Sequence, residues 1–243
     1  MTITERQQKI LNILVQEYIR KAEPISSDFL EKKYKMGISP ATIRNELQKL
    51  NELGYLEQPY FSSGRIPTNK AYRFFVDHFL KLNHIKENSL ISDKIANFLK
   101  RADYDRYKTI EFITKVLSLS VSGLTITYLY KKDILLKEGW KKVFQNPEFK
   151  ENDYLEGFFK AIENFEKKIG DFCELCEENK EEINVFIGKE RPFLGPNSFS
   201  LIISGTTFFK NEDILLGILG PKRMNYNKNI NIIHSLIKRL EKL

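Results

Sequence analysis

The stretch from residue 38 to residue 68 constrains the fold more than any other part of this chain. It places a short segment with strong helix signals directly before a polar hairpin. Ser39 is a good helix N-cap, and Pro40 stands at the first helical position, where proline is tolerated. Gly54 is suited to end the helix in the left-handed conformation. A helix followed by a hairpin in this order is typical of a winged helix-turn-helix domain.

The predicted helix has one apolar and one polar side. Ile43, Leu47 and Leu50 recur at the i, i+4, i+7 spacing of a buried stripe. The other sides carry residues that bind bases or phosphates: Thr42, Arg44, Asn45, Gln48 and Lys49. The start of such a helix enters the major groove, so we predict a recognition helix. The alternative is a solvated helix face.

The predicted contacts differ along this helix. Asn45 or Gln48 is suited to bind adenine, and Arg44 is suited to bind guanine. Ser39 and Thr42 lie near the helix N-terminus, where phosphate oxygens are favoured, and Pro40 between them is also an expected DNA contact. Each of these assignments is a hypothesis about one side chain.

The residues after the helix are predicted to form the wing. Tyr55–Tyr60 has the pattern of its first strand, and residues 65–67 return. The predicted tip consists of Ser62, Ser63 and Gly64, which we expect to contact DNA together with Arg65. A narrow tip beside Arg65 suits insertion of the guanidinium into the minor groove or against a phosphate. An ordinary charged hairpin tip is the alternative.

Helices are predicted on both sides of this stretch. The first runs from Glu5 to about Lys21, and a short one follows from Ser26 or Ser27 to about Tyr34. A helix over Asn69–Leu82 carries Lys70 and Arg73 off its buried stripe, where they could contact DNA. Two more are predicted at about 89–101 and 105–119. We therefore predict a winged-helix domain over 1–84 and a helical linker over 85–120.

From residue 121 onward the pattern changes to that of an α+β domain. Alternating residues predict strands at 124–130 and 134–138, and apolar runs predict strands at 183–187, 199–203 and 214–219. Helices are predicted at 152–168, with an acidic continuation to 179, and from about 227 to the end. We expect a mostly antiparallel sheet with helices on one side.

Composition narrows the function classes. The net charge is +7, with +4 over residues 1–84 and −7 over residues 147–190, which fits a DNA-binding end and a separate end that does not bind DNA. No apolar run reaches the length of a membrane span, and no secretory signal is recognised, so a cytoplasmic protein is expected.

No catalytic or metal-binding pattern stands out. Cys173 and Cys176 form a lone CxxC without a second ligand pair, so we expect ordinary helix residues and no metal or cofactor. The segment 217–221 lacks the pattern of a phosphate loop, although Lys222 and Arg223 could bind an anion. The absence of an enzyme signature favours a binding protein.

Several segments resemble the heat-inducible transcription repressor (HrcA) family. ATIRNEL, GYLEQP, SSGRIPT and AYRFFVD resemble its N-terminal domain in order and spacing. Gly139-Trp140, residues 146–149 (NPEF), 187–190 (IGKE) and 217–226 (GILGPKRMNY) resemble its C-terminal half. Tyr60 stands where the family usually has histidine, and Ala71 where it usually has glycine.

The resemblance implies a winged helix followed by a GAF-like domain with an inserted dimerisation subdomain. Most members are longer, and the missing part is predicted between about Leu119 and Gly139, so the GAF-like half is truncated. The implied function is a repressor that binds an inverted-repeat DNA operator of chaperone genes as a homodimer and is released by heat, with chaperonin as a partner. Rival hypotheses are a winged-helix regulator that senses a small ligand and a protein–protein interaction module.

Overall fold

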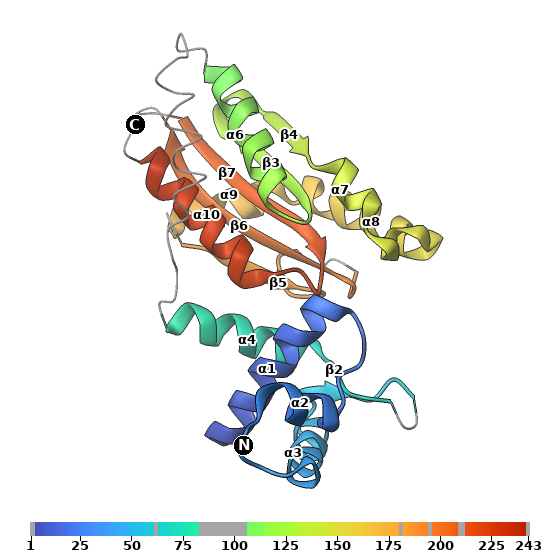
Figure 1. Ribbon diagram of the computed structural model, residues 1–243. Coiled ribbons are helices and arrows are strands. Elements are labelled where there is room, and N and C mark those ends of the chain that lie inside the picture. The colour runs from blue at the N-terminus through green and yellow to red at the C-terminus, as the bar shows by residue number, and fades with distance from the viewer. Residues whose placement is uncertain are drawn as a thin grey trace. The chain divides into compact units, whose positions relative to one another are not determined.

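The computed structural model describes residues 3–60, 63–82, 106–179, 182–193, 196–208 and 212–241 (Figure 1). The chain forms two compact units, Met1–Asn83 and His84–Leu243. The helix predicted at about 89–101 lies outside the described residues.

The first unit contains the predicted order of helices and wing. Its elements are α1 (Glu5–Lys21), α2 (Ser27–Tyr34), α3 (Pro40–Glu52), β1 (Leu56–Glu57), β2 (Ile66–Pro67) and α4 (Asn69–Lys81). The side chains of Thr4, Ser26 and Ser39 each accept a hydrogen bond from a backbone N–H of the first turn that follows. Gly54 has φ +75 just beyond α3, as expected of a helix stop. The predicted helices are confirmed, whereas the wing strands are shorter than predicted.

The wing is joined to the segment between α1 and α2. Ile25 N–H donates to Arg65 O at 3.0 Å, and Arg65 N–H donates to Ile25 O at 2.8 Å. A Cβ added to Gly64 would lie 2.5 Å from the Ile25 carbonyl carbon, so only glycine allows this approach. β1 pairs with β2 in the register Leu56 to Pro67. The wing is thus a two-stranded sheet of very short strands, with one further bridge from Arg65 to Ile25.

A buried acidic residue joins α1 to α2. Glu17 is 2% exposed and accepts hydrogen bonds from Lys33, Tyr34 and Arg20. Burial by itself raises the pKa of Glu17, but the hydrogen bonds and the charges of Lys33 and Arg20 outweigh it, and the net pKa is lowered. The same burial and carboxylate raise the pKa of Tyr34 to about 12.

The second unit is built on one antiparallel sheet. Its strands are β3 (Leu124–Leu129), β4 (Ile134–Glu138), β5 (Asn184–Ile187), β6 (Phe199–Phe208) and β7 (Glu212–Pro221), in the order β4-β3-β7-β6-β5. Every neighbouring pair is antiparallel. Its helices are α6 (Arg106–Ser120), α7 (Trp140–Gln145), α8 (Asn152–Lys167), α9 (Ile169–Glu178) and α10 (Tyr226–Leu240), with 3₁₀ turns η1 (Tyr130–Lys132) and η2 (Pro147–Lys150). Strands β6 and β7 are longer than predicted.

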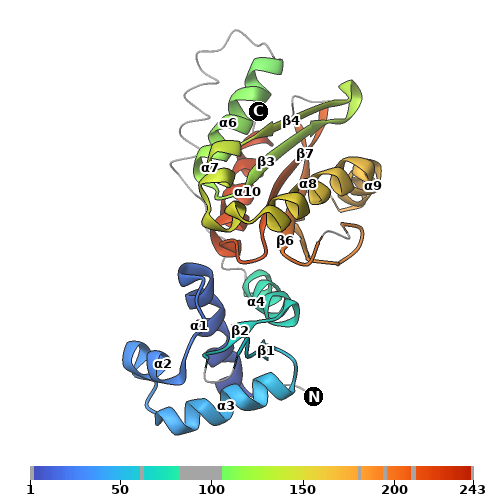
Figure 2. The same ribbon diagram turned by 90° about the vertical axis from the view of Figure 1, so that its right-hand side faces the viewer.

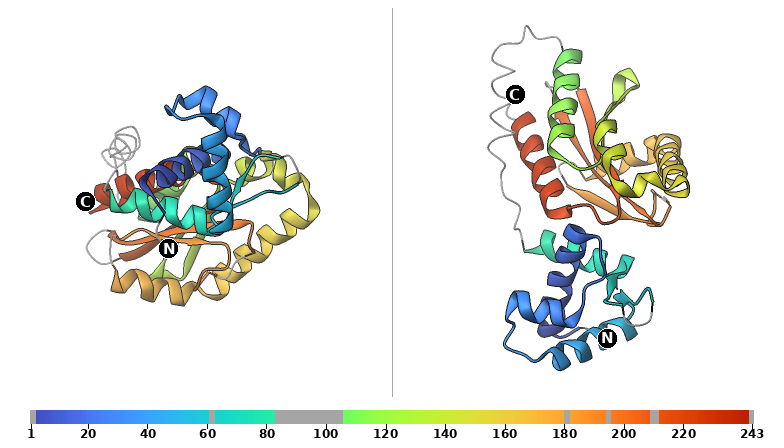
Figure 3. Two further views of the ribbon diagram at one scale, coloured as in Figure 1. Left: turned by 90° about the horizontal axis from the view of Figure 1, so that it is seen from below. Right: turned by 45° about the vertical axis from the view of Figure 1, so that its right-hand side comes forward.

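Helices cover both faces of this sheet, so the prediction of helices on one side was wrong. α8 and α9 pack on one face and α6 and α10 on the other (Figure 2 and Figure 3). On the α6 face, Thr127 is fully buried and its hydroxyl accepts from Thr114 of α6 at 2.9 Å. On the same face, Tyr226 at the start of α10 and Ser200 of β6 share a hydrogen bond of 2.8 Å. Strand β7 is apolar at nearly every position, as a strand buried on both faces must be.

Residues 106–120 of the predicted linker belong to the second unit. α6 contacts β3 and β4, and its last turn is capped from another helix. Lys142 Nζ of α7 donates to the carbonyl oxygens of Ser118 (3.0 Å), Leu119 and Val121 (3.3 Å). A cation at a helix C-terminus is favourable because the last carbonyls are unpaired and carry partial negative charge.

An aromatic cluster fills the core between the sheet and α8. Phe158 is fully buried and lies edge-on to Phe149 at 4.9 Å and to Trp140 at 6.4 Å between ring centroids. Its neighbour Phe159 is 44% exposed. Adjacent residues of one helix therefore differ in burial but not in chemistry.

We predict that Glu17→Gln lowers the free energy of unfolding of the first unit at pH 7 by about 1–3 kcal/mol, because it removes a buried charged acceptor. Since the pKa of Glu17 is lowered in the folded chain, the contribution is full above roughly pH 4.3 and is lost as the pH falls through the folded value. The difference from wild type should therefore shrink toward pH 3. Hydrogen exchange of α1 amides measures it, with exposed Glu23→Gln as the control. Equal protection at pH 7 would contradict the prediction.

We predict that Phe158→Ala costs the second unit about 3–5 kcal/mol, through lost burial and the cavity left behind. Phe159→Ala should cost less than about 1 kcal/mol, since exposed positions are tolerant. The single Trp140 reports unfolding of this unit by fluorescence in a urea titration. Equal losses for the two variants would refute the assignment of the core.

Candidate nucleic-acid interface

The polar side of α3 is open to solvent. Ile43, Leu47 and Leu50 are buried against the first unit, as the spacing predicts. Four of the predicted DNA contacts on α3 are exposed, namely Arg44, Asn45, Gln48 and Lys49. The buried stripe anchors the helix while its other side presents amides and cations. This combination of donors and acceptors matches the edges of bases and the phosphates that border the major groove.

The start of α3 is ordered by its own hydroxyls. Ser39 Oγ accepts from the Thr42 backbone N–H at 3.1 Å and shares a 3.0 Å hydrogen bond with Thr42 Oγ1. Ser39 and Pro40 are exposed and Thr42 is half-buried. The first turn is thus held in place with its hydroxyls at the surface, next to the positive end of the helix dipole.

The wing arginine contacts α3. Arg65 donates to Gln48 Oε1 at 3.1 Å, and Gln48 Nε2 donates to Glu52 Oε1 at 3.2 Å. A pocket of about 390 Å³ lies between the wing, the start of α2 and α3, and its lining includes Arg44, Asp28 and Arg65. Two arginines therefore stand together on the wing side of α3.

The structure describes two of the three predicted tip residues, and their contact with DNA stays a prediction. Gly64 makes the close approach to Ile25, which is a structural role. Ser63 donates its hydroxyl to Tyr60 O at 2.7 Å and so tightens the turn. Ser62 lies outside the described residues. Tyr60 is 66% exposed beside this turn.

Lys70 and Arg73 have partners within the first unit. Lys70 Nζ donates to Leu53 O at 2.8 Å, at the end of α3, and lies 4.4 Å from the ring centroid of Tyr55. Arg73 forms an ion pair with Asp77 at 3.3 Å. Lys70 therefore caps the recognition helix at the end opposite Ser39. The structure thus gives both residues intramolecular contacts, whereas their predicted contact with DNA stays a prediction.

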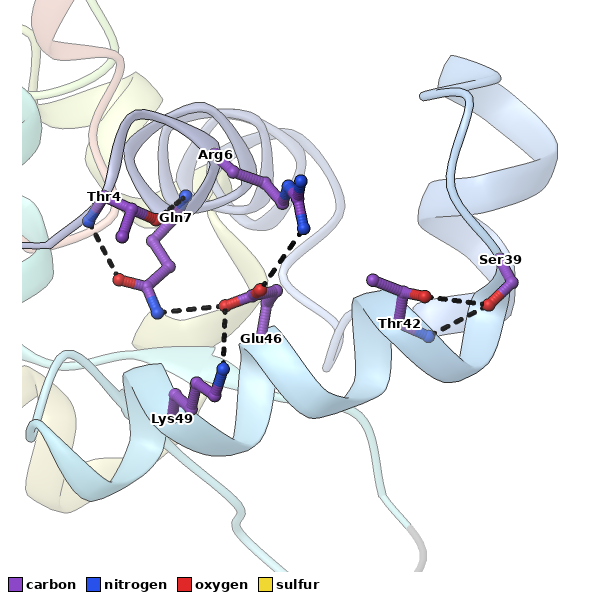
Figure 4. A network of polar contacts seen from close by, with 7 residues as sticks. All are labelled: Thr4, Arg6, Gln7, Ser39, Thr42, Glu46 and Lys49. Carbon is purple, nitrogen blue, oxygen red and sulfur yellow. Dashed lines mark hydrogen bonds and ion pairs between the residues drawn. The ribbon is translucent and has the colours of Figure 1, made fainter.

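Sequence reasoning missed Glu46. This residue is 9% exposed and accepts from Gln7 Nε2 of α1 at 2.9 Å (Figure 4). It also pairs with Arg6 at 3.7 Å and Lys49 at 3.9 Å. The helical spacing could have identified this residue, because Glu46 occupies the i+3 position after Ile43 and so lies on the buried stripe. A carboxylate on such a stripe needs polar partners, since an unpaired buried charge is costly.

Two motifs of the second unit meet in space. Arg223 donates to Glu148 Oε1 at 2.8 Å and to Asn146 Oδ1 at 3.4 Å. The ion pair joins the segment 146–149 to the segment 217–226. Arg223, considered above as an anion ligand, is engaged in this contact.

The two cysteines lie in α9, as expected. Cys176 is buried and Cys173 half-buried. Burial raises the pKa of Cys173 to about 11 and that of Cys176 to about 12, which disfavours the reactive thiolates. Within the described ranges, no three His, Cys, Asp or Glu side chains gather as metal ligands would. None of the helices in the described part of the chain is both long and apolar enough to cross a bilayer.

Comparison with known proteins places both units. The family description "Winged helix-turn-helix transcription repressor, HrcA DNA-binding" matches residues 2–78, and "HrcA protein C terminal domain" matches residues 68–230. A solved structure described only as a hypothetical protein has a TM-score of 0.75 at 18% identity, covering 99% of this chain and 98% of that chain. The predicted fold class, a winged helix followed by a GAF-like α+β domain, is confirmed.

Curated relatives agree with this placement. The heat-inducible transcription repressor HrcA of Thermoanaerobacter sp. (strain X514) is 28% identical over 342 aligned positions, covering 100% of this chain and 97% of that protein. The heat-inducible transcription repressor HrcA of Alkaliphilus metalliredigens is 42% identical over 139 residues, which cover 56% of this chain and 40% of that protein. The one of Pelotomaculum thermopropionicum is 48% identical over 93 residues, which cover 37% of this chain and 27% of that protein. The first alignment is about a hundred positions longer than this chain of 243 residues, so that relative carries residues that have no counterpart here. The chain belongs to the HrcA family of heat-inducible transcription repressors.

Proposed function

We propose that this chain is a sequence-specific repressor of heat-shock (chaperone) genes that reads double-stranded DNA with α3 in the major groove. The observation that carries the proposal is the exposed row of Arg44, Asn45 and Gln48 on a helix that a wing arginine contacts directly. Membership of a family of transcription repressors supports it. Such a protein acts where the DNA is, in the cytoplasm.

The proposed roles follow from position on α3. Asn45 is exposed, and its amide suits the N6 and N7 edge of adenine. Gln48 already holds Arg65 and Glu52, so we assign it to orient the wing arginine as well as to approach a base. Arg44 and Arg65 lie on the wing side and would meet guanine or phosphate. Ser39 and Thr42, at the helix start, would meet phosphate oxygens.

The two ends of α3 differ in the groups that they offer to DNA. The last turn carries mixed charge, because exposed Glu52 would repel phosphate whereas Lys49 would attract it. Lys70 holds the carbonyl of Leu53 at this end. The first turn has hydroxyls and the positive end of the helix dipole, so we propose that the start of α3 enters the groove, as in other helix-turn-helix proteins.

We further propose that the chain acts as a homodimer on an inverted repeat and leaves it on heating. One helix and wing read only a short half-site with modest affinity, and two-fold symmetry is the usual remedy. The curated relatives carry the name heat-inducible transcription repressor, which motivates the release on heating. A chaperonin that helps the repressor keep its active fold is the partner that the family resemblance implies.

We predict that Asn45→Ala weakens binding to a specific duplex about 5- to 150-fold, the equivalent of roughly 1–3 kcal/mol, and relaxes base preference. The duplex would be selected from a random pool with the wild-type protein and compared with a scrambled one by fluorescence anisotropy. Gln48→Ala is the second test, and Gln16→Ala, an exposed amide on α1, is the control. Wild-type affinity of both Asn45→Ala and Gln48→Ala would refute this face of α3.

We predict that the selected duplexes contain inverted repeats and bind two chains each, because a homodimer presents two copies of α3 related by a two-fold axis. Sedimentation of the complex gives the stoichiometry, and repeating the titration at two temperatures tests release by heat. One chain bound to a site without a repeat would contradict the dimer. Undiminished binding on heating, while the fold is intact by circular dichroism, would contradict release.

A further inference from the structure

We infer that Arg6 of α1, held beside Lys49 by the buried Glu46, forms a second phosphate-contacting flank of the recognition helix, on the side opposite the wing. This inference rests on the proposed function, because it concerns the same DNA surface. It adds a residue outside the helix-turn-helix and wing to that surface, and it gives Glu46 a positioning role.

The contacts show a carboxylate that gathers two cations without covering them. Glu46 is nearly buried, with its side chain 11% exposed, and it lies 3.7 Å from Arg6 and 3.9 Å from Lys49. The side chains of Arg6 and Lys49 are 56% and 59% exposed. Figure 4 shows one carboxylate paired with both cations, and more than half of each cation's side chain is exposed.

The first turn of α1 is fixed well enough to hold Arg6 in place. Thr4 and Gln7 form a capping box, in which the Thr4 N–H donates to Gln7 Oε1 at 3.0 Å and the Gln7 N–H donates to Thr4 Oγ1 at 3.3 Å. The other end of the Gln7 amide donates to Glu46. One buried amide therefore connects the cap of α1 to α3, directly beside Arg6.

The position around α3 indicates a second flank. With 3.6 residues per turn, Arg44 and Lys49 project well apart around the helix axis, and the exposed Asn45 and Gln48 lie between them. Arg44 lines the pocket on the wing side together with Arg65. Lys49 stands on the side where α3 meets α1 through Glu46 (Figure 4). The cations therefore bracket the amides that we assign to the bases.

The width of the DNA major groove allows phosphate contacts on both sides of α3. An α-helix with its side chains is about 10–12 Å across, and the major groove is about 12 Å wide. A helix in the groove therefore lies between two phosphate backbones. Arg44 and Arg65 would face one backbone, and Arg6 and Lys49 the other. Without its two cations the carboxylate of Glu46 would repel that second backbone, whereas the group of three carries a net positive charge.

We predict that Arg6→Gln weakens binding to the selected and the scrambled duplex alike, about 3- to 10-fold near 0.1 M salt. The slope of log affinity against log salt should fall by about one, as for the loss of a single phosphate contact. The matched control is Lys9→Gln, an exposed cation on the same helix that contributes no contact to Glu46, which should leave affinity and slope at wild-type values. Equal losses of affinity for Arg6→Gln and Lys9→Gln would overturn the inference, because the loss would then reflect the lower net charge and not a contact of Arg6 with phosphate.

The positioning role of Glu46 is tested by Glu46→Gln. Glutamine can still accept from the Gln7 amide, but it no longer holds Arg6 and Lys49 by charge. We expect weaker binding to both duplexes, although removal of a negative charge would by itself tighten binding to DNA. Tighter binding by Glu46→Gln would therefore overturn the positioning role. Circular dichroism of the same samples checks that the Glu46→Gln variant is folded. Because Arg6 is exposed, Arg6→Gln tests the phosphate contact without changing a buried group.

The wild-type titration separates this inference from the proposed function. If the wild type binds neither duplex, the proposed function fails. If it binds the selected duplex tightly and Arg6→Gln does so with the same affinity and salt slope, the second flank alone is refuted.

Discussion

The backbone pairing of Ile25 with Arg65 is the contact on which the geometry of the first unit depends. It brings the base of the wing against the segment before α2, at a distance that only Gly64 permits. That pairing places the Arg65 side chain within reach of Gln48 on α3. The wing and the recognition helix therefore act as one surface. A substitution at Gly64 would therefore disturb the pairing that positions Arg65 as well as the wing tip itself.

Buried polar groups add orientation to what the apolar core provides. Ile43, Leu47 and Leu50 anchor α3, but apolar contacts are not directional and do not by themselves define its rotation about the helix axis. Glu46 and Gln7 fix the rotation from α1, and Glu17 fixes α2 in the same way. In the second unit, Arg223 and Glu148 connect two segments far apart in sequence. Each network links elements whose relative position the apolar stripes leave free.

The sequence predicted the elements of the first unit closely, because capping residues and glycines next to each helix determine where it begins and ends. Thr4, Ser26 and Ser39 cap the helices that follow them, and Gly54 stops α3. The exposed row of α3 was also predictable from helical periodicity alone. The sheet was predicted less well: its strands and the helices α6 and α10 were predicted, but their packing on a second face of the sheet was not. The alternation over 124–130 is typical of a strand with one exposed face, yet Thr125 and Thr127 on its polar side are both fully buried.

The sequence by itself determined where helices begin and end, which side of α3 is polar, and the family to which the motifs point. These properties depend on neighbours a few residues apart. Only the tertiary structure decided that Arg65 reaches Gln48, that Lys70 caps α3, and that Arg6, Glu46 and Lys49 lie together. These contacts join residues up to about forty positions apart, as Gln7 and Glu46 show. No local periodicity encodes such pairs, because they exist only once the packing of α1 against α3 has fixed the distance between them.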